Sequence, residues 1–432
     1  MIKKEFIIKK INNLPSELVH LIFLTRNLAN IQKVGVYLVG GFVRDLILGV
    51  KNFDLDIVVE RDGIDFAYKL SRILNAYVLK HRAFKTATIT TREGLKIDIA
   101  TCRREFYPEP AALPIVNKGT IDDDLFRRDF TVNAMACHID FEKFGQFVDM
   151  SGGLSDLRKE KIRFLHEKSF IDDPTRIIRA VRFEQRFKFN IDLKTLQLIK
   201  QAKKFKMLER VQKHRIRDEI ILIFKEKDPY RVLKRLKQLY NLSFIDKNIR
   251  FNKKFRKIFS RIDNISIWFQ SEFSERRGLD IWLMYFIIFL APFNIKQLNN
   301  FLSKFAFHRG DSKRMISFKK EFIKIDKKLS KSKISAIELY NILHVVSYEV
   351  TLLTYVISRE KIVKKRIRDF FIKHHHKKLS ITGKDLLALG VKAGPEFRRI
   401  FNKVFKEKIN GKIHTYEEEL ELVKKILNGK CL

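Results

Sequence analysis

Strand-like sequence is confined to the first third of this 432-residue chain. Five short runs there are rich in Val, Ile and Thr and are bounded by turn residues, as strands commonly are. The five runs are residues 34–41, 53–60, 85–91, 95–102 and 131–140. Two helical patterns, 43–49 and 64–75, fall between them. This alternation predicts an α/β head of about 140 residues.

Beyond the head the pattern becomes helical, because apolar residues recur at three- and four-residue spacing, as in 193–208 and 229–245. Basic segments recur as well, at 251–262 and 361–378. The formal net charge of the chain is +38. Such an excess favours a polyanionic partner, either nucleic acid or an anionic membrane surface. A general lysine bias of the surface is the alternative explanation.

The sequence also bears on the compartment. Cys102, Cys137 and Cys431 form no CxxC pair, which fits a reducing cytosol. Residues 1–13 lack the apolar core and cleavage site of a signal peptide. The longest apolar run, 281–291, is shorter than the roughly 20 residues that span a bilayer, so it is interpreted as a buried helix. We therefore expect a soluble, cytoplasmic protein with no membrane partner.

Two aspartates interrupt the hydrophobic run 53–60. Asp54 and Asp56 project from the same face of a strand, since side chains two residues apart do so. Two adjacent carboxylates repel each other unless a cation lies between them, and Mg²⁺ prefers oxygen ligands. Asp98 supplies a third carboxylate if its strand lies alongside, and such a set suits a two-metal site. The spacing alone has another explanation, in which the two aspartates keep an edge strand soluble by preventing it from pairing with other chains.

A glycine pair precedes the aspartates. Gly40 and Gly41 follow a strand and precede a helix, so their amides and the helix N-terminus can cradle a triphosphate. Arg44 can add a cationic contact to the same phosphates. The succession of strand, glycine pair, helix, strand and aspartate pair within a short span favours the catalytic interpretation over the explanation by edge-strand solubility.

The segment 172–183 predicts a two-sided helix. On a 3.6-residue period its arginines fall within an arc of roughly 120°, and the apolar residues fill the opposite arc. The arginines are Arg176, Arg179 and Arg182, followed on the same face by Arg186 just beyond the segment, and the apolar residues are Ile177, Ile178 and Val181. One face is therefore expected to pack, and the other to form a cationic groove.

Six segments together resemble a known family. "LVGGFVRDLILG" followed by "FDLDIVVE" resembles the first motif of the polymerase-β superfamily of nucleotidyltransferases. Four further segments match, in order, the class II bacterial tRNA nucleotidyltransferases and poly(A) polymerases. They are the RRD motif (122–136), the head-to-neck connector (148–163), the base-selecting motif (172–183) and the helical motif after it (208–220).

The resemblance implies an α+β fold, with a polymerase-β-like head of mixed sheet and helices followed by all-α parts. The expected parts are an N-terminal helical extension (1–30), the catalytic head (31–145), a helical neck with the nucleotide-selecting motif (146–245), a basic, RNA-binding helical body (246–378) and a helical tail (379–432).

The resemblance also implies roles for single residues. Asp54 and Asp56 would hold two Mg²⁺ ions, with Asp98 as a third catalytic carboxylate. Arg128 would contact the nucleotide, and Asp129 would support the site. The remaining nucleotide-binding candidates are Gly40, Gly41, Arg44, Asp173, Arg176, Arg179 and Arg182.

Asp173 and Arg176 have the chemistry of a base reader. A carboxylate accepts from an exocyclic amine, and a guanidinium donates to a ring nitrogen. Cytosine and adenine offer that amine beside an acceptor nitrogen, whereas uracil and guanine present the reverse polarity. The pair can therefore admit C and A, and refuse U and G, without a nucleic-acid template.

The implied function is transfer of nucleotides from ATP, with CTP as a second candidate, to the 3′ end of the tRNA acceptor arm. The segment 102–120 carries three prolines and few charges after Glu109, and it resembles the loop of A-adding relatives, which work with a separate CC-adding enzyme. Poly(A) polymerase on general RNA and a catalytically silent RNA-binding protein are the alternatives.

Overall fold

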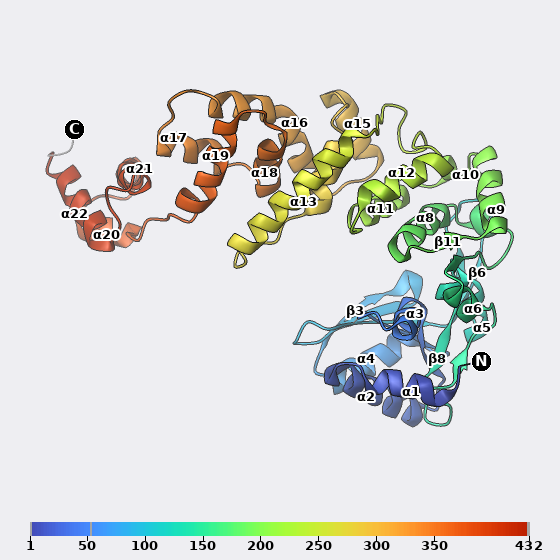
Figure 1. Cartoon of the computed structure of the whole chain (residues 1–432). Coiled ribbons are helices and arrows are strands. Elements are labelled where there is room, and N and C mark those ends of the chain that lie inside the picture. The colour runs from blue at the N-terminus through green and yellow to red at the C-terminus, as the bar shows by residue number, and fades with distance from the viewer. Residues whose placement is uncertain (1, 52–53, 430–432) are drawn as a thin grey trace. The chain divides into compact units, whose positions relative to one another are not determined.

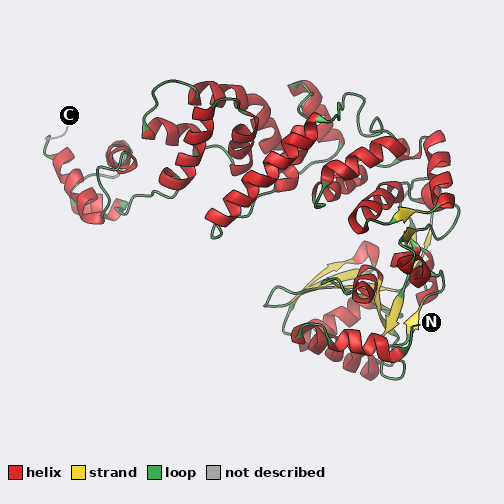
Figure 2. Ribbon diagram, in the orientation of Figure 1, coloured by secondary structure: helices red, strands yellow, loops and turns green. Residues whose placement is uncertain are grey.

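The computed structural model of the chain describes residues 2–51 and 54–429. Its residues form two compact units, Met1–Lys247 and Asn248–Leu432 (Figure 1). The first unit combines a sheet with helices, and the described part of the second is helical (Figure 2). The expected α+β class is confirmed, while the finer division into extension, head, neck, body and tail stays a prediction.

A seven-stranded mixed sheet forms the centre of the first unit, in the order β3-β4-β5-β2-β1-β8-β9. Strands β2 and β5 are parallel, and the other neighbouring pairs are antiparallel. The strands are β1 Val36–Val39, β2 Leu55–Val59, β3 Tyr77–His81, β4 Thr86–Thr90, β5 Lys96–Thr101, β8 Ala136–His138 and β9 Phe147–Val148. Two pairs lie outside this sheet, β6 Arg103–Phe106 with β7 Ile115–Lys118, and β10 Lys161–Ile162 with β11 Asn190–Ile191.

The structure corrects the expected strands in three places. The run 131–140 is a strand only over β8, because Thr131–Asn133 form a 3₁₀ turn closed by the bond from the Ala134 amide to the Thr131 carbonyl. The edge strand β3 was missed because its side chains are mostly exposed and lack apolar alternation. The segment 102–120, expected as a loop, contains the hairpin β6–β7. Phe53, the expected first residue of its strand, lies outside the described residues.

Helices cover the sheet and continue into the second half of the first unit. They are α1 Lys4–Asn12, α2 Ser16–Gln32, α3 Gly40–Leu48, α4 Gly63–Ile73, α5 Ile121–Phe126, α6 Gly153–Arg158, α7 Ser169–Asp172, α8 Thr175–Phe187, α9 Leu193–Lys204, α10 Met207–Arg210, α11 Lys213–Phe224 and α12 Pro229–Leu239. Both helices expected within the head are present as α3 and α4. Asp62 caps α4 by accepting from the amides of Ile64 and Asp65.

One expectation about the core of this unit is confirmed, and the structure adds the state of two cysteines. Ile177, Ile178 and Val181 on α8 are fully buried, so the apolar arc of that helix packs. Cys102 and Cys137 are buried free thiols, and Cys431 lies outside the described residues.

The described part of the second unit is built from helices of 5 to 21 residues. They are α13 Lys254–Glu272, α14 Ile281–Phe289, α15 Ile295–Lys304, α16 Arg309–Leu329, α17 Ala336–Leu343, α18 Tyr348–Ile357, α19 Lys361–Asp369, the π-helical Phe370–His374, α20 Gly383–Ala388, α21 Pro395–Ile409 and α22 Tyr416–Leu427. The apolar run 281–291 forms α14, which is buried over most of its length, as expected. None of the described helices has the length and apolarity needed to cross a membrane.

Candidate active site

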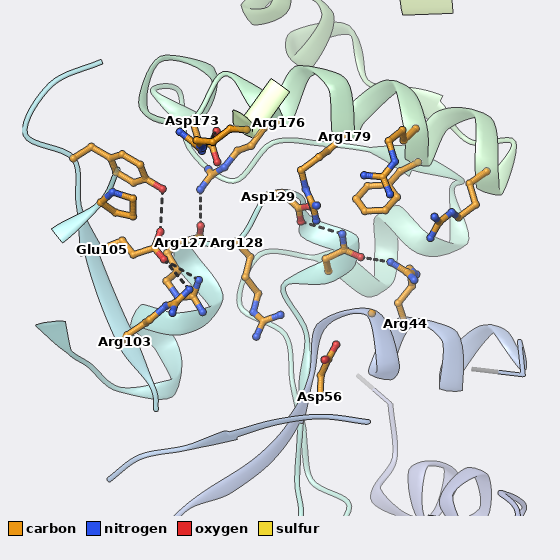
Figure 3. A pocket seen from close by; sticks show the side chains of 18 residues that line it. Arg44, Asp56, Arg103, Glu105, Arg127, Arg128, Asp129, Asp173, Arg176 and Arg179 are labelled. Carbon is orange, nitrogen blue, oxygen red and sulfur yellow. Dashed lines mark hydrogen bonds and ion pairs between the residues drawn. The ribbon is translucent and has the colours of Figure 1, made fainter. Parts of the chain in front are cut away.

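A cavity of about 550 Å³ in the first unit collects most of the expected site residues. Nine arginines and four carboxylates line it, so its walls carry an excess of positive charge. Figure 3 shows Asp56 on one side of this cavity and Asp173 with Arg176 on the other. The lining residues are Gly41, Arg44, Asp56, Arg103, Glu105, Tyr107, Pro114, Arg127, Arg128, Asp129, Asn133, Asp173, Arg176, Arg179, Arg182, Phe183, Arg186 and Arg215.

The expected carboxylates meet at the β2–β5 pair. Asp56 and Asp98 are register partners on these parallel strands, so their side chains share one face of the sheet. Asp54 lies just before β2 and is exposed. Asp98 is also exposed and accepts a hydrogen bond of 2.6 Å from the Thr88 hydroxyl. Burial raises the pKa of Asp56 to about 6, with Arg128 opposing the rise and Asp98 and Asp54 adding to it.

The chemistry of these donors fits a divalent cation. A cation beside Asp56 would offset the repulsion between its carboxylate and its acidic neighbours. Within residues 2–51 and 54–429, no three His, Cys, Asp or Glu side chains form a group that could hold a metal alone. Mg²⁺ held by Asp54 and Asp56 would therefore take its remaining ligands from water or nucleotide phosphates, as Mg²⁺ commonly does.

Gly40 allows the close approach of Arg128. Its φ is +65°, and a Cβ built on it would lie 2.4 Å from Nη1 of Arg128. The Gly40 amide donates to the Met135 carbonyl at 3.2 Å, so it is engaged within the protein. Of the two glycines expected to cradle phosphates, Gly41 lines the cavity.

Gly40→Ala is expected to lower both stability and nucleotide affinity. The left-handed backbone would cost about 1–2 kcal/mol with a Cβ present, and the methyl group would push Arg128 out of place. Thermal unfolding and ATP titration would measure the two effects. Gly94→Ala is the matched control, because Gly94 also has a positive φ but faces no atom within 4 Å. Equal ATP affinity in the two variants would contradict this role of Gly40.

Asp124 anchors both arginines of the RRD motif. Its side chain is fully buried and accepts from Arg127 at 2.6 Å and from Arg128 at 2.9 Å. Burial opposes its ionisation, but the two arginines outweigh burial and hold the pKa of Asp124 below its usual range. Arg127 also pairs with Glu105 at 3.1 Å, and the Tyr107 hydroxyl donates to that same glutamate at 2.9 Å.

Asp129 connects the segment that follows α5 to α8. It accepts from Nη2 of Arg179 at 2.7 Å and from Nδ2 of Asn133 at 2.9 Å. Burial opposes the charge of Asp129, and Arg179 and Asn133 outweigh it, so its pKa lies below the usual range. Asn133 accepts in turn from Arg44 at 2.5 Å, and Arg44 also pairs with Asp45 at 2.8 Å. The Arg44 guanidinium, expected at the phosphates, is thus partly engaged by protein groups.

Three of the four arginines of α8 are paired with carboxylates, although the face that they form lines a cavity with an excess of positive charge, as expected. Glu219 on α11 pairs with Arg182 at 2.8 Å and with Arg179 at 3.6 Å. Glu226, which follows α11, pairs with Arg182 at 3.2 Å and with Arg186 at 2.6 Å. Arg182 is only 4% exposed. All of these arginines still line the cavity.

Asp173 and Arg176 both line the cavity, and protein contacts hold each of them. Oδ1 of Asp173 accepts from the Thr175 amide at 3.0 Å and from Nη2 of Arg215 at 2.8 Å. Among the described residues nothing donates to its Oδ2, which leaves that oxygen to a ligand. Arg176 donates to the Ser169 hydroxyl at 2.7 Å and to the Arg127 carbonyl at 2.6 Å.

Comparison with known proteins places the chain in a family. Residues 36–163 match the family described as "Poly A polymerase head domain", and residues 188–245 match "Probable RNA and SrmB- binding site of polymerase A". The chain is 33% identical over 408 residues to the A-adding tRNA nucleotidyltransferase of Halalkalibacterium halodurans, covering 92% of this chain and 90% of that protein. The chain belongs to the tRNA nucleotidyltransferase family.

Two further tRNA nucleotidyltransferases extend the comparison. The A-adding enzyme of Geobacter sulfurreducens is 32% identical over 399 residues, covering 91% of this chain. This chain spans only 45% of the length of that relative. The structure of the Thermotoga maritima CCA-adding enzyme complexed with tRNA is 31% identical, with a TM-score of 0.64 and 98% of both chains covered.

Several residues that line the cavity of this tRNA nucleotidyltransferase were not predicted as site residues from the sequence. They are Arg103, Glu105, Tyr107, Pro114, Arg127, Asn133, Phe183 and Arg215. The segment carrying Glu105 and Tyr107 was interpreted as a loop. The mostly polar strand β6 in that segment lacks the apolar pattern by which a strand is predicted. Asn133 lies within the RRD segment and could have been selected there, since a buried amide needs hydrogen-bond partners.

Proposed function

We propose that this chain transfers AMP from ATP to the 3′ end of tRNA. The observation that carries the proposal is one cavity joining Asp56, an excess of arginines, and the pair Asp173 and Arg176. The 3′-hydroxyl oxygen of the RNA attacks the α-phosphorus of ATP and forms a new P–O bond. The bond from that phosphorus to the β-phosphate oxygen breaks, pyrophosphate leaves, and the hydroxyl proton passes to solvent.

Asp54 and Asp56 are the residues that would hold Mg²⁺, with Asp98 beside them on β5. Bound there, the metal would lower the pKa of the attacking hydroxyl and offset charge on the phosphates. The chain itself supplies the counter-charge for the triphosphate, since Arg128 lies close to Asp56 and the other cavity arginines surround it. Bidentate guanidinium contacts suit phosphate oxygens.

Asp173 and Arg176 would select the base. Oδ2 of Asp173 would accept from the N6 amine of adenine, and Arg176 would donate to N1. With uracil or guanine, the carboxylate would face another acceptor and the guanidinium another donor. Neither group could then form a hydrogen bond to the base, which is costly in a desolvated cavity. Cytosine has the same polarity as adenine, so this pair by itself supports both ATP and CTP as substrates.

Two observations favour addition of A alone. The two curated relatives described above are named A-adding. The segment between β6 and β7 carries Pro108, Pro110 and Pro114, and prolines restrict the conformations a loop can adopt. A separate enzyme that adds the two C residues is then the expected partner. The basic helices of the second unit would grip the RNA through its phosphates.

The purified protein is expected to add one AMP to tRNA ending in CC, and nothing to tRNA ending in C or at the discriminator base. Each of the three tRNAs would be incubated with each nucleoside triphosphate singly, and the products resolved by gel. Incorporation of CMP would contradict the A-only assignment. Long A tails on unrelated RNA would support the poly(A) polymerase alternative, and RNA binding without any addition would support the silent RNA-binding alternative.

A further inference from the structure

A second pocket lies in the helical unit, among α13, α18 and α19. α18 packs against both of the other helices (Figure 1). The pocket has a volume of about 370 Å³, which lies within the range of small-molecule sites in proteins. Its polar and aromatic lining consists of Arg261, Asn264, Trp268, Tyr355, Lys364 and Arg368. It is called the Trp268 pocket below.

The charge of the Trp268 pocket is entirely positive. Arg261, Lys364 and Arg368 line it, and no carboxylate does. In the part of the chain that the structure describes, none of these three side chains forms an ion pair. Asp369, the neighbour of Arg368 in the chain, pairs instead with Lys373 at 2.9 Å. Three cations without a counter-charge favour an anionic ligand, and phosphate oxygens suit both guanidinium and ammonium groups.

Two aromatic side chains stand among these cations. The Arg368 guanidinium lies 4.8 Å from the centre of the Trp268 ring, and the Lys364 ammonium lies 5.8 Å from that of Tyr355. Phe273 meets the Trp268 ring edge to face, with 5.7 Å between the ring centres, and so supports the indole. Both pocket aromatics are partly exposed. Aromatic rings and guanidinium planes are the surfaces on which unpaired nucleic-acid bases stack.

Basic residues continue from the pocket along two of its helices. On α13, Lys257 precedes Arg261 by four residues, and on α19, Lys361 precedes Lys364 by three. Residues at these spacings share one face of a helix. Both outer lysines are exposed. A phosphate chain that leaves the pocket therefore meets further cations along either helix, which a free nucleotide is too small to use. The ligand that fits this arrangement is a nucleotide within an RNA strand.

We propose that the Trp268 pocket is a nucleotide-binding site, built from other residues than the catalytic cavity, that holds one unstacked nucleotide of an RNA strand. Its base stacks against Trp268, and Arg261 and Lys364 hold the flanking phosphates from opposite helices. The Asn264 amide both donates and accepts, so the site accepts any of the four bases. This base contact goes beyond the phosphate contacts proposed above and does not depend on AMP transfer.

Trp268 itself can report on the site. The chain has two tryptophans, Trp268 and Trp282, so Trp282→Phe leaves Trp268 as the only indole. The fluorescence of this full-length variant would be titrated separately with single-stranded oligoadenylate, with AMP and with inorganic phosphate. The oligonucleotide is expected to quench the fluorescence, because a stacked base contacts the indole directly. AMP should bind more weakly than the oligonucleotide, and inorganic phosphate should not quench.

Two substitutions separate the charge of the pocket from its stacking surface. Lys364→Gln should lower the slope of log Kd against log salt by about 0.7, the contribution of one phosphate contact on a single strand. Lys365→Gln is the matched control, since it removes the same charge from α19 but does not line the pocket. Trp268→Leu keeps an apolar side chain against Phe273 and should raise Kd about tenfold without changing the slope. Anisotropy of a labelled oligoadenylate would give each Kd, and thermal unfolding would check the fold.

The remaining outcomes would overturn the proposal. If neither the oligonucleotide nor AMP quenches Trp268, the pocket holds no base. Equal quenching by inorganic phosphate, or equal salt slopes in Lys364→Gln and Lys365→Gln, would reduce the site to general attraction of anions. Equal affinity for AMP and the oligonucleotide would overturn the assignment to an RNA strand in favour of a free nucleotide. Quenching by the oligonucleotide in a chain that adds nothing to any tRNA would contradict the proposed function alone.

Discussion

Replacing Asp56 with Asn is expected to lower the rate of AMP addition at least about 10³-fold, because the carboxylate that would hold the metal is lost. The fold should be unaffected. The amide has nearly the shape of the carboxylate and removes a charge that burial and the neighbouring Asp98 and Asp54 disfavour, as the raised pKa of Asp56 indicates. Near neutral pH the variant should unfold at the same temperature as the wild type or slightly higher.

The measurement is a single-turnover rate of AMP incorporation into tRNA ending in CC, together with thermal unfolding. Asp65→Asn is the matched control, since Asp65 is an exposed carboxylate on α4 whose partner is Lys69 at 2.7 Å. It should change neither quantity, because such surface pairs contribute little. A rate for Asp56→Asn within tenfold of the wild-type rate would contradict a catalytic role for Asp56.

Arg182→Met should be the most destabilising of the substitutions considered, lowering the free energy of unfolding by about 3–5 kcal/mol. The side chains of Arg182, Glu219 and Glu226 are 5%, 11% and 7% exposed. Removing the guanidinium leaves two largely buried carboxylates with less positive charge between them. For a unit of this size the unfolding temperature should fall by roughly 10 °C.

Arg186→Met separates this structural role from the loss of charge alone. Arg186 pairs with the same Glu226, but its side chain is 42% exposed, so its removal should cost no more than about 1 kcal/mol. Thermal unfolding and ATP affinity would be measured for both variants, with affinity determined well below the unfolding transition. Normal stability with lost ATP affinity in Arg182→Met would instead assign Arg182 to the nucleotide.

The sequence by itself determined the local features of this protein. The spacing of Asp54 and Asp56 predicts that the two carboxylates lie close together, and the structure has Asp56 in β2 with Asp54 just before it. The arginine and isoleucine periods of 172–183 predict which side of α8 packs. Both follow from backbone geometry, since the extended backbone of a strand fixes the period of 2.0 residues and the helical backbone fixes the period of 3.6 residues. The motif order was enough to identify the family that the comparisons confirm.

Only the tertiary structure decided which carboxylates and carbonyls pair with the buried arginine side chains. Glu219 and Glu226 lie about 40 residues from Arg182, and Arg215 meets the Ala111 carbonyl from a still more distant segment. A periodic pattern shows which face of a helix is polar, but the packing angle between helices sets which side chains meet across it. A buried guanidinium must be paired because an unpaired buried charge is costly, yet its partner can come from any element that packs against it.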